Sequence, residues 1–334
     1  MSMTFRARSG LTSPLREIQL PVRASLDAVG DEIWRIVADD CPLVEEVNDH
    51  LMLMKGKLFR PTLVLLANAV QDTPSPRGVT LAAVVELIHV GSLVHDDAVD
   101  HSALRRGMPT INALFSHQVS VLMGDYLYSR ALREIVRSGD VEALRILTEA
   151  SSDMTLGEMR QLAAVDKLGV TEEDYYALNH AKTASLIAAS CEVGALHGAP
   201  SRRAALARYG EQLGMAFQVA DDLLDYTEAE EMTGKPSGLD LREHKVTLPL
   251  IAAMREMPAA ARARVADLFA APVAEDAEIA EVIASVAEHG GLDYARRKGE
   301  EFAQGAEEAL ADVPDTPARA ALVDAIGYVM NRRW

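Results

Sequence analysis

The chain has 334 residues, of which 49% are hydrophobic and 25% charged, and its formal net charge at pH 7 is −17. This composition is typical of a globular protein with a sizeable core. The negative charge argues against a nucleic-acid binder, which needs Lys and Arg to replace counterions. The two cysteines cannot build a disulfide framework, so a reduced, cytoplasmic setting is expected. We find no secretory signal, and no run approaches the roughly 18 uncharged apolar residues of a membrane span.

Helix-forming residues dominate the chain. Ala, Leu, Glu and Arg are abundant, aromatic residues make up 5%, and alternating β-branched runs are absent. Breaks are expected near Cys41-Pro42 and at Gly107-Met108-Pro109. From the N-terminus the pattern predicts two helices within 15–54, a helix over 57–70 with Pro61 in its first turn, a loop at 71–78 and a long helix over 79–101.

The rest of the chain continues in the same way. The pattern predicts helices over 118–137, 141–168, 172–197 and 201–226, and then a Gly/Pro loop at 234–238. Four or five Ala-rich helices follow from 247 to 334, separated by Pro258, Pro272, Gly290-Gly291 and Pro314. Because no linker, low-complexity tract or repeat is visible, we expect one all-α domain over 1–334.

An acidic cluster ends the long helix predicted over 79–101. Asp96 and Asp100 are four residues apart and therefore point the same way on a helix, with Asp97 beside them. Carboxylates this close repel each other, and a hard divalent cation such as Mg²⁺ would relieve the repulsion and bridge to substrate phosphates. Arg105 and Arg106 follow at once, and guanidinium groups match phosphate geometry. The stretch predicts a metal-held diphosphate above an apolar pocket.

A second cluster repeats the same spacing. Asp221, Asp222 and Asp225 again form D-D-x-x-D at the end of an apolar helical run. One such cluster alone could equally be a solvated helix face. Two copies with identical spacing favour a shared site, in which facing helices of a bundle hold several Mg²⁺ ions between them.

Cations stand at several positions that suit a diphosphate, although each alone could be a solvated surface charge. Lys57 and Arg60 lie three apart at a helix start, where the helix dipole also favours anions. Lys182-Thr183 interrupts an apolar stretch, which indicates a buried or cleft-facing role. Lys235 and Lys245 flank the Gly/Pro loop and could close over phosphates as a lid.

His89 lies seven residues before Asp96 and shares its helix face. A lone histidine on an apolar helix is usually a core residue, and here a ligand contact is about equally expected. A zinc site is not expected, because no second His or Cys stands at a suitable spacing.

Taken together, these motifs resemble the all-trans polyprenyl diphosphate synthase family of isoprenyl transferases. The resemblance runs in order over the catalytic motifs at 56–250, while the N-terminal 50 residues and the helices at 259–334 match only as generic helix. It rests on GKLFRP, on the first aspartate motif with RRGMPT, on GDYLY, on Lys182-Thr183, on FQVADDLLDY and on GKPSGLDLREHKVTLPLI.

The resemblance implies a bundle of antiparallel helices around a deep central cavity, usually in a homodimer. Three Mg²⁺ ions per active site would be held by Asp96, Asp100 and Asp221, with Asp97, Asp222 and Asp225 in support. The allylic diphosphate would be held by Arg105, Lys182, Thr183, Gln218, Lys235 and Lys245, and isopentenyl diphosphate by Lys57, Arg60, His89 and Arg106. The implied reaction ionises the allylic diphosphate, and the double bond of isopentenyl diphosphate then attacks the cation.

Product length should depend on how far the growing tail can run before it meets a bulky side chain. The positions four, five and eight residues before Asp96 are Ser92, Gly91 and Ile88, none of them aromatic. We therefore expect a product of C30–C50, which leaves the protein unaided or through peripheral contact with a membrane. The alternatives are a farnesyl or geranylgeranyl diphosphate synthase and, more remotely, a terpene cyclase or a non-catalytic partner subunit. Met123, Tyr126 or Leu127 of a neighbouring helix could still form a floor.

Overall fold

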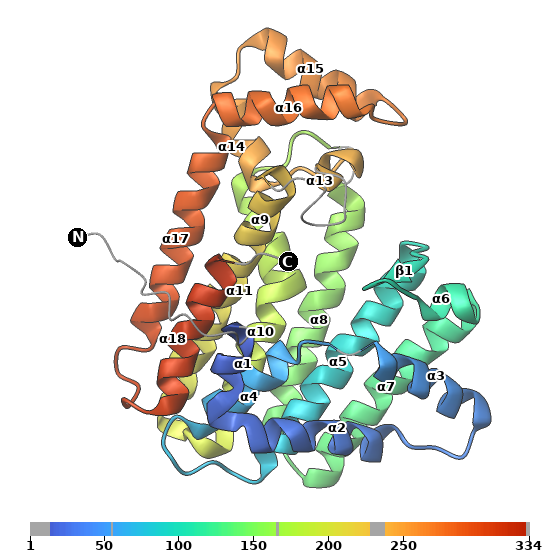
Figure 1. The fold of residues 1–334 in the computed structure, drawn as a ribbon, viewed down its shortest axis with the longest axis vertical. Coiled ribbons are helices and arrows are strands. Elements are labelled where there is room, and N and C mark those ends of the chain that lie inside the picture. Colours follow the sequence, from blue (N-terminus) through green and yellow to red (C-terminus); the bar gives the residue numbers. More distant parts are fainter. Residues whose placement is uncertain (1–13, 55, 165–166, 228–237, 332–334) are drawn as a thin grey trace.

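The computed structural model describes residues 14–54, 56–164, 167–227 and 238–331, and these residues form an almost entirely helical molecule (Figure 1). The all-α fold expected from the sequence is confirmed. Long helices stand side by side in the body of the molecule, with shorter helices across both of its ends.

The N-terminal part has four segments: α1 (Pro14–Gln19), the 3₁₀ turn η1 (Leu20–Val22), α2 (Arg23–Val37) and α3 (Pro42–Leu53), of which α2 lies across one end of the molecule (Figure 1). The predicted break near Cys41-Pro42 is observed, and Pro42 starts α3 because a helix's first residue needs no N–H partner. The carbonyls at the end of α2 are capped from another helix: Arg130 donates to Ile36 O at 2.6 Å, and the Tyr126 hydroxyl to Val37 O at 2.9 Å.

Six helices supply much of the apolar core of the bundle. They are α4 (Phe59–Ala69), α5 (Arg77–Val99), α7 (His117–Ser138), α8 (Val141–Ala164), α10 (Ser185–Gly198) and α11 (Arg203–Thr227), with the turn η3 (Pro200–Arg202) before α11. Small residues let these helices approach closely. A Cβ added to Gly194 of α10 would lie 2.2 Å from the Val64 carbonyl oxygen of α4. The two backbones therefore pack in direct contact.

Helix α5 is apolar on most of its surface, and by length and composition it is a helix that could cross a membrane. The expectation from the sequence concerned uncharged runs, and Glu86 divides this helix into two shorter ones. The qualifying window has a mean hydropathy of 1.6, and 56% of it is buried inside the molecule. A helix that is apolar all round is also what the centre of a large bundle requires.

A short hairpin follows α5 where the sequence predicted only a break. Strands β1 (Leu104–Arg105) and β2 (Met108–Pro109) pair antiparallel, and α6 (Ile111–Leu114) comes next. The turn residues Arg106 and Gly107 have φ of 53° and 75°, the left-handed pair that a two-residue hairpin turn needs. The sequence obscured this turn because arginine rarely adopts positive φ.

The helix predicted over 172–197 contains a π-helical turn. It consists of α9 (Glu172–Asn179), the π turn η2 (His180–Ala184) and α10, and the turn carries Lys182 and Thr183. Such π bulges are common at functional sites. At this turn α8 comes very close, because a Cβ on Gly157 would lie 2.8 Å from the Lys182 backbone nitrogen.

The C-terminal part adds α13 (Leu239–Arg242), α14 (Leu248–Glu256), α15 (Ala259–Ala270), α16 (Asp276–Glu288), α17 (Gly291–Ala309) and α18 (Pro317–Met330). The five helices from α14 onward, among the described residues, agree with the four or five that the sequence predicted. Helix α17 packs along α11, and α15 and α16 lie across one end of the bundle (Figure 1). That end is the one at which both aspartate clusters are found.

Candidate active site at the ends of the central helices

The first aspartate cluster lies at the C-terminal end of α5, and its carboxylates differ in exposure and in hydrogen-bond partners. Asp96 lies half-buried in the last turn and Asp100 is the exposed C-cap residue. Asp97 is 4% exposed, and both of its oxygens accept from Arg105 Nε, at 2.9 and 2.8 Å. This ion pair docks the hairpin onto α5. Asp96 and Asp100 are thus the two carboxylates of this cluster that Arg105 does not bind directly.

Asp96 sits among more negative than positive charge. Burial raises the pKa of its carboxyl to about 6, helped by Glu158 and Asp100 and opposed by Lys182 and Arg105. Glu158 belongs to α8, so the helix that faces α5 adds its own carboxylate to the cluster. A cation placed here would therefore gain from several carboxylates at once.

Lys182 is held by α8. Its ammonium lies 2.8 Å from Glu158 Oε1 and donates to Gln161 Oε1 at 2.9 Å. The neighbouring Thr183 is 7% exposed. The π turn therefore turns Lys182 towards Glu158 and the acidic cluster, and its role in a cleft stays a prediction.

The second aspartate cluster ends α11, and each carboxylate has its own environment. Asp222 is 8% exposed and accepts from the Tyr175 hydroxyl at 2.5 Å. Asp225 accepts from the backbone N–H groups of Leu239 and Asp240, at 2.9 and 3.1 Å, and so holds the start of α13. Asp221 is half-buried.

Negative charge accumulates here as well. Burial and the nearby Asp240 raise the pKa of Asp222 well above its usual value. Burial and Asp225 raise the pKa of Asp240 to about 7. Each carboxylate thus opposes the ionisation of the others, as at Asp96.

Lys245 connects the two clusters electrostatically. Burial would lower the pKa of its ammonium, but the ion pair with Glu243 and the charges of Asp240 and Asp100 raise it. One lysine therefore feels a carboxylate from each cluster, which indicates that the clusters face a common space. Lys235, the other cation of the predicted lid, lies outside the described residues.

The donor set fits magnesium. Among the described residues, no three His, Cys, Asp or Glu side chains form a group that could hold a metal ion by themselves. Mg²⁺ does not require such a cage, because it commonly takes one or two carboxylates together with waters and substrate phosphates. Asp96 and Asp100, one helical turn apart in an excess of negative charge, offer that kind of half-site.

Beside the acidic clusters lies a group of cations around Arg60. Its Nη1 donates to His89 Nε2 at 3.0 Å, so this ring nitrogen is the acceptor. Burial, Arg60 and Arg106 lower the pKa of His89 well below its usual value, and the ring is therefore neutral with its proton on Nδ1. Burial also lowers the pKa of Arg60 to about 10. Buried Nε of Arg60 has no hydrogen-bond partner among the described residues, which leaves a donor for an incoming anion.

A buried carboxylate balances these cations. Glu86 of α5 is 8% exposed, and burial raises its pKa while Arg60 and Arg106 lower it. Arg106 Nη1 also donates to Met54 O at 3.2 Å. The cluster thus draws on α4, α5 and the hairpin, and it has the charge to bind a second diphosphate.

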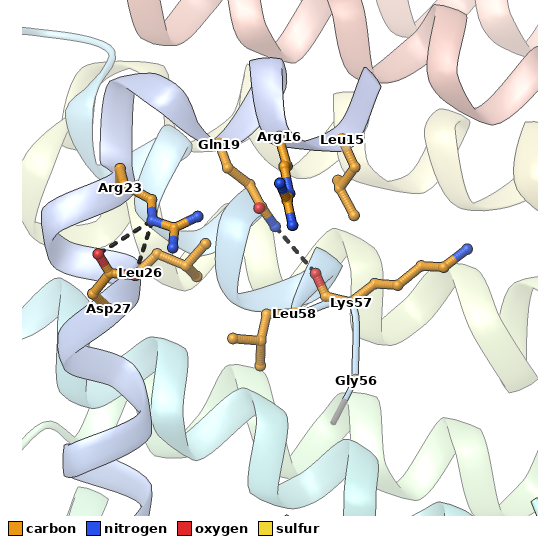
Figure 2. A pocket seen from close by; sticks show the side chains of 9 residues that line it. All are labelled: Leu15, Arg16, Gln19, Arg23, Leu26, Asp27, Gly56, Lys57 and Leu58. Atoms are coloured by element: carbon orange, nitrogen blue, oxygen red, sulfur yellow. Dashed lines mark hydrogen bonds and ion pairs between the residues drawn. The ribbon is translucent and has the colours of Figure 1, made fainter. Parts of the chain in front are cut away.

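Lys57 lies on the loop before α4, and its side chain is exposed. The Gln19 side-chain amide donates to its carbonyl at 3.1 Å, and Leu58 has a left-handed φ of 50°. Figure 2 shows a cavity of about 360 Å³ that is lined by α1, α2 and this loop, and into which Arg16 points. The hydrogen bond from Gln19 therefore holds the backbone of the loop, while the Lys57 side chain extends away from Gln19.

Known proteins resemble this chain over most of its length. The family model for polyprenyl synthetase matches residues 41–286. The chain belongs to the polyprenyl synthetase family. It is 36% identical over 321 residues to an all-trans-nonaprenyl-diphosphate synthase (geranyl-diphosphate specific) of Rhodobacter capsulatus. This match covers 95% of this chain and 98% of the relative. It is 37% identical over 324 residues to an octaprenyl diphosphate synthase of Escherichia coli, covering 95% and 99%.

A solved structure also has the fold of this chain. The polyprenyl synthase of Caulobacter crescentus, described as complexed with calcium and isoprenyl diphosphate, has a TM-score of 0.89 at 32% identity, and the match covers 98% of this chain and all of that one, 100%. The chain is therefore a prenyltransferase of isoprenoid biosynthesis, and its family generally depends on magnesium.

Three residues of α5 were expected to set product length, and the structure gives the surroundings of each. Ile88 is 2% exposed in the core, and the Ser92 hydroxyl donates to His89 O at 2.8 Å. Gly91 packs against α7, where an added Cβ would lie 3.3 Å from the Gly124 carbonyl oxygen. That Gly91 faces the growing tail stays a prediction, and its small size also permits the close contact between α5 and α7.

The sequence analysis did not predict a role for five residues that contact the candidate site: Glu86, Glu158, Gln161, Tyr175 and Asp240. Glu86 carried a usable signal, because it is an isolated charge three residues before His89 in an apolar run. Asp240 stood inside a quoted motif. The remaining three come from other helices, and nothing in their local spacing marks them.

Proposed function

We propose that this prenyltransferase is a trans-polyprenyl diphosphate synthase that condenses isopentenyl diphosphate with an allylic diphosphate to a C30–C50 product. The observation that carries the proposal is the pairing of two acidic clusters around one space, with a separate cation cluster beside them. Condensation of two diphosphates needs two such anion sites.

The allylic diphosphate binds between the aspartate clusters. Asp96, Asp100 and Asp221 would hold three Mg²⁺ ions, whose charge would help to neutralise the leaving diphosphate. Asp97, Asp222 and Asp225 act in support, through Arg105, Tyr175 and the turn at Leu239. The diphosphate oxygens are held by Arg105, Lys182, Thr183, Gln218, Lys235 and Lys245.

Isopentenyl diphosphate binds at the other cluster. Arg60 donates from its buried Nε, Lys57 and Arg106 supply charge from the two flanking loops, and neutral His89 donates from Nδ1. Because Glu86 balances part of this charge, the cluster tolerates burial before substrate arrives.

The chain's own groups then act on developing charge. Lys182, Arg105 and Lys245 stabilise the negative charge on the departing diphosphate, so the allylic C–O bond can ionise. The double bond of isopentenyl diphosphate attacks C1, and the proton lost afterwards goes to the departing diphosphate. The apolar walls of α5 exclude the water that would quench the cation.

The tail runs from Asp96 back along α5. Each helical turn of about 5.4 Å accommodates roughly one isoprene unit. Ser92, Ile88, Val84 and Val85 succeed one another along this path, and none is aromatic. This is the reason for proposing a long product over farnesyl or geranylgeranyl diphosphate, and relatives described as octaprenyl and nonaprenyl synthases support it.

We further propose that residues 1–334 form one catalytic unit that works as a cytoplasmic homodimer. Large apolar side chains lie exposed on α7 and α8: Leu122 and Val136 are 67% and 62% exposed, and Leu156 and Met159 are 46% and 62% exposed. A second copy covering this face would remove them from water. Release of a long product would then involve peripheral contact with a membrane.

A product-length assay tests the proposal. The protein is incubated with Mg²⁺, labelled isopentenyl diphosphate and farnesyl diphosphate, and the dephosphorylated products are sized by chromatography. We expect a ladder that ends between C30 and C50. A stop at C15 or C20 would contradict the proposed product, and no elongation would contradict the proposed function.

A further inference from the structure

The second aspartate cluster is attached to the helix of Lys182 by two polar contacts. On α9, Tyr175 donates to Asp222 Oδ2 at 2.5 Å, and four residues later Asn179 Oδ1 accepts from the Gln218 amide at 3.3 Å. On α11 the partners also lie four residues apart, in the opposite order. The two contacts are thus successive rungs between antiparallel helices, one turn apart.

Three of the four side chains in these two contacts are buried, and Gln218 is half-buried. Tyr175, Asn179 and Asp222 are 2%, 5% and 8% exposed. The Tyr175 ring contacts Tyr176 edge-on at 5.5 Å between centroids and packs with Val219 and Leu248. A ring fixed on all sides can present its hydroxyl in one place only.

The start of α9 is fixed as well. Thr171 and Asp174 form a reciprocal capping box at its N-terminus. From Tyr175 the helix runs through Asn179 into the π turn with Lys182. The ladder therefore sets the register between the lysine that faces Asp96 and the carboxylates that end α11.

We infer that Tyr175 is a positioning residue, whose hydroxyl fixes the Asp222 carboxylate so that the second aspartate cluster receives the metal–diphosphate complex in one orientation. This inference rests on the proposed function. A core tyrosine with no such role would need its ring but not its hydroxyl. In Tyr175→Phe the ring packing stays, and Asp222 loses its donor inside a group of carboxylates.

Tyr175→Phe tests the inference, with Tyr176→Phe as the matched control. Tyr176 is the adjacent tyrosine, and its hydroxyl donates to Glu172 at 2.7 Å, away from the aspartates. We expect Tyr175→Phe to need about 10- to 100-fold more Mg²⁺ for half-maximal turnover, the usual effect of removing a group that orients a metal ligand. The KM for isopentenyl diphosphate stays as in the wild type, because the Arg60 cluster is unchanged. Tyr176→Phe leaves both quantities unchanged.

A binding measurement separates positioning from a general loss of structure. The melting temperature is followed as Mg²⁺ is titrated in the presence of inorganic diphosphate, for each variant and for Asp222→Asn with and without Tyr175→Phe. We expect the midpoint of the Mg²⁺ titration to rise in Tyr175→Phe and to rise no further when it is added to Asp222→Asn.

Provided that the wild type makes polyprenyl product, two results would overturn the inference. One is a Mg²⁺ dependence of Tyr175→Phe equal to that of the wild type, and the other is an equal change of Mg²⁺ dependence in Tyr175→Phe and Tyr176→Phe. If Tyr175→Phe does not fold, additive effects of Tyr175→Trp and Asp222→Asn on the Mg²⁺ midpoint would overturn it equally. A wild type that makes no polyprenyl product would instead overturn the proposed function.

Discussion

The two ends of the helical bundle treat their carboxylates in opposite ways. At the N-terminal end of α5, Asp140 lies 2.5 Å from His197 Nε2 and 3.5 Å from Arg77. Burial would raise the pKa of Asp140, but hydrogen bonds with His197 and the Ala143 N–H, together with the charge of Arg77, lower it overall. Close by, ion pairs with Arg145 and Arg203 lower the pKa of Glu142 to about 2.

At the other end of α5 the carboxylates face one another. This helix has 23 residues, so its ends lie roughly 35 Å apart. There the pKa of Asp96 is raised to about 6 and that of Asp240 to about 7, mainly by burial and by neighbouring carboxylates. Carboxylates thus stabilise the fold at the end where they have hydrogen-bonding or charged partners. They lower its stability at the end where they lie buried beside one another.

The largest effect is expected from removing a carboxylate at the acidic end. Asp96→Ala or Asp221→Ala should lower turnover by about 100- to 1,000-fold or more, because charge stabilisation of the leaving group is the main catalytic contribution. Steady-state assays with farnesyl and isopentenyl diphosphate measure this. Asp140→Asn is the control at the other end. Turnover in Asp96→Ala above about a tenth of the wild-type value would contradict the role of this cluster.

A smaller change is expected along the tail's path below Asp96. Ser92→Phe places an aromatic ring one turn from the cluster, and we expect products of C15–C20 with turnover largely kept. Product sizing by chromatography measures this, and Ser92→Ala should keep the wild-type length. Long products from Ser92→Phe would show that the tail takes another path.

The smallest effect is on stability at the paired end. Asp140→Asn should lower the free energy of unfolding by about 1–2 kcal/mol at pH 7, because the carboxylate charge facing His197 and Arg77 is lost while the amide oxygen still caps α8. The pKa of Asp140 is lowered in the folded protein, so its contribution is present above the ordinary value of 3.8 and disappears as the pH falls below it. Urea unfolding at pH 7 and pH 3 checks this. An equal difference at both pH values would contradict the pairing.

The sequence predicted the acidic end better than its surroundings, for a physical reason. The spacing of Asp96 and Asp100 places both on one helix face without reference to any other helix. Glu158 and Tyr175 could not be foreseen, because they reach the site from helices whose packing is decided by distant contacts. The close approach of Gly91 to Gly124 of α7 could not be foreseen for the same reason.

The clearest test of the contrast between the two ends is the effect of ligand on stability. Melting temperatures of the wild type, Asp96→Asn and Asp140→Asn are measured with and without saturating Mg²⁺ and inorganic diphosphate. We predict a rise of about 5 °C in the wild type and in Asp140→Asn, since a ligand at 100 times its Kd adds about 2.7 kcal/mol. Asp96→Asn should show little or no rise. An unchanged wild type, or an equal rise in all three proteins, would contradict the account.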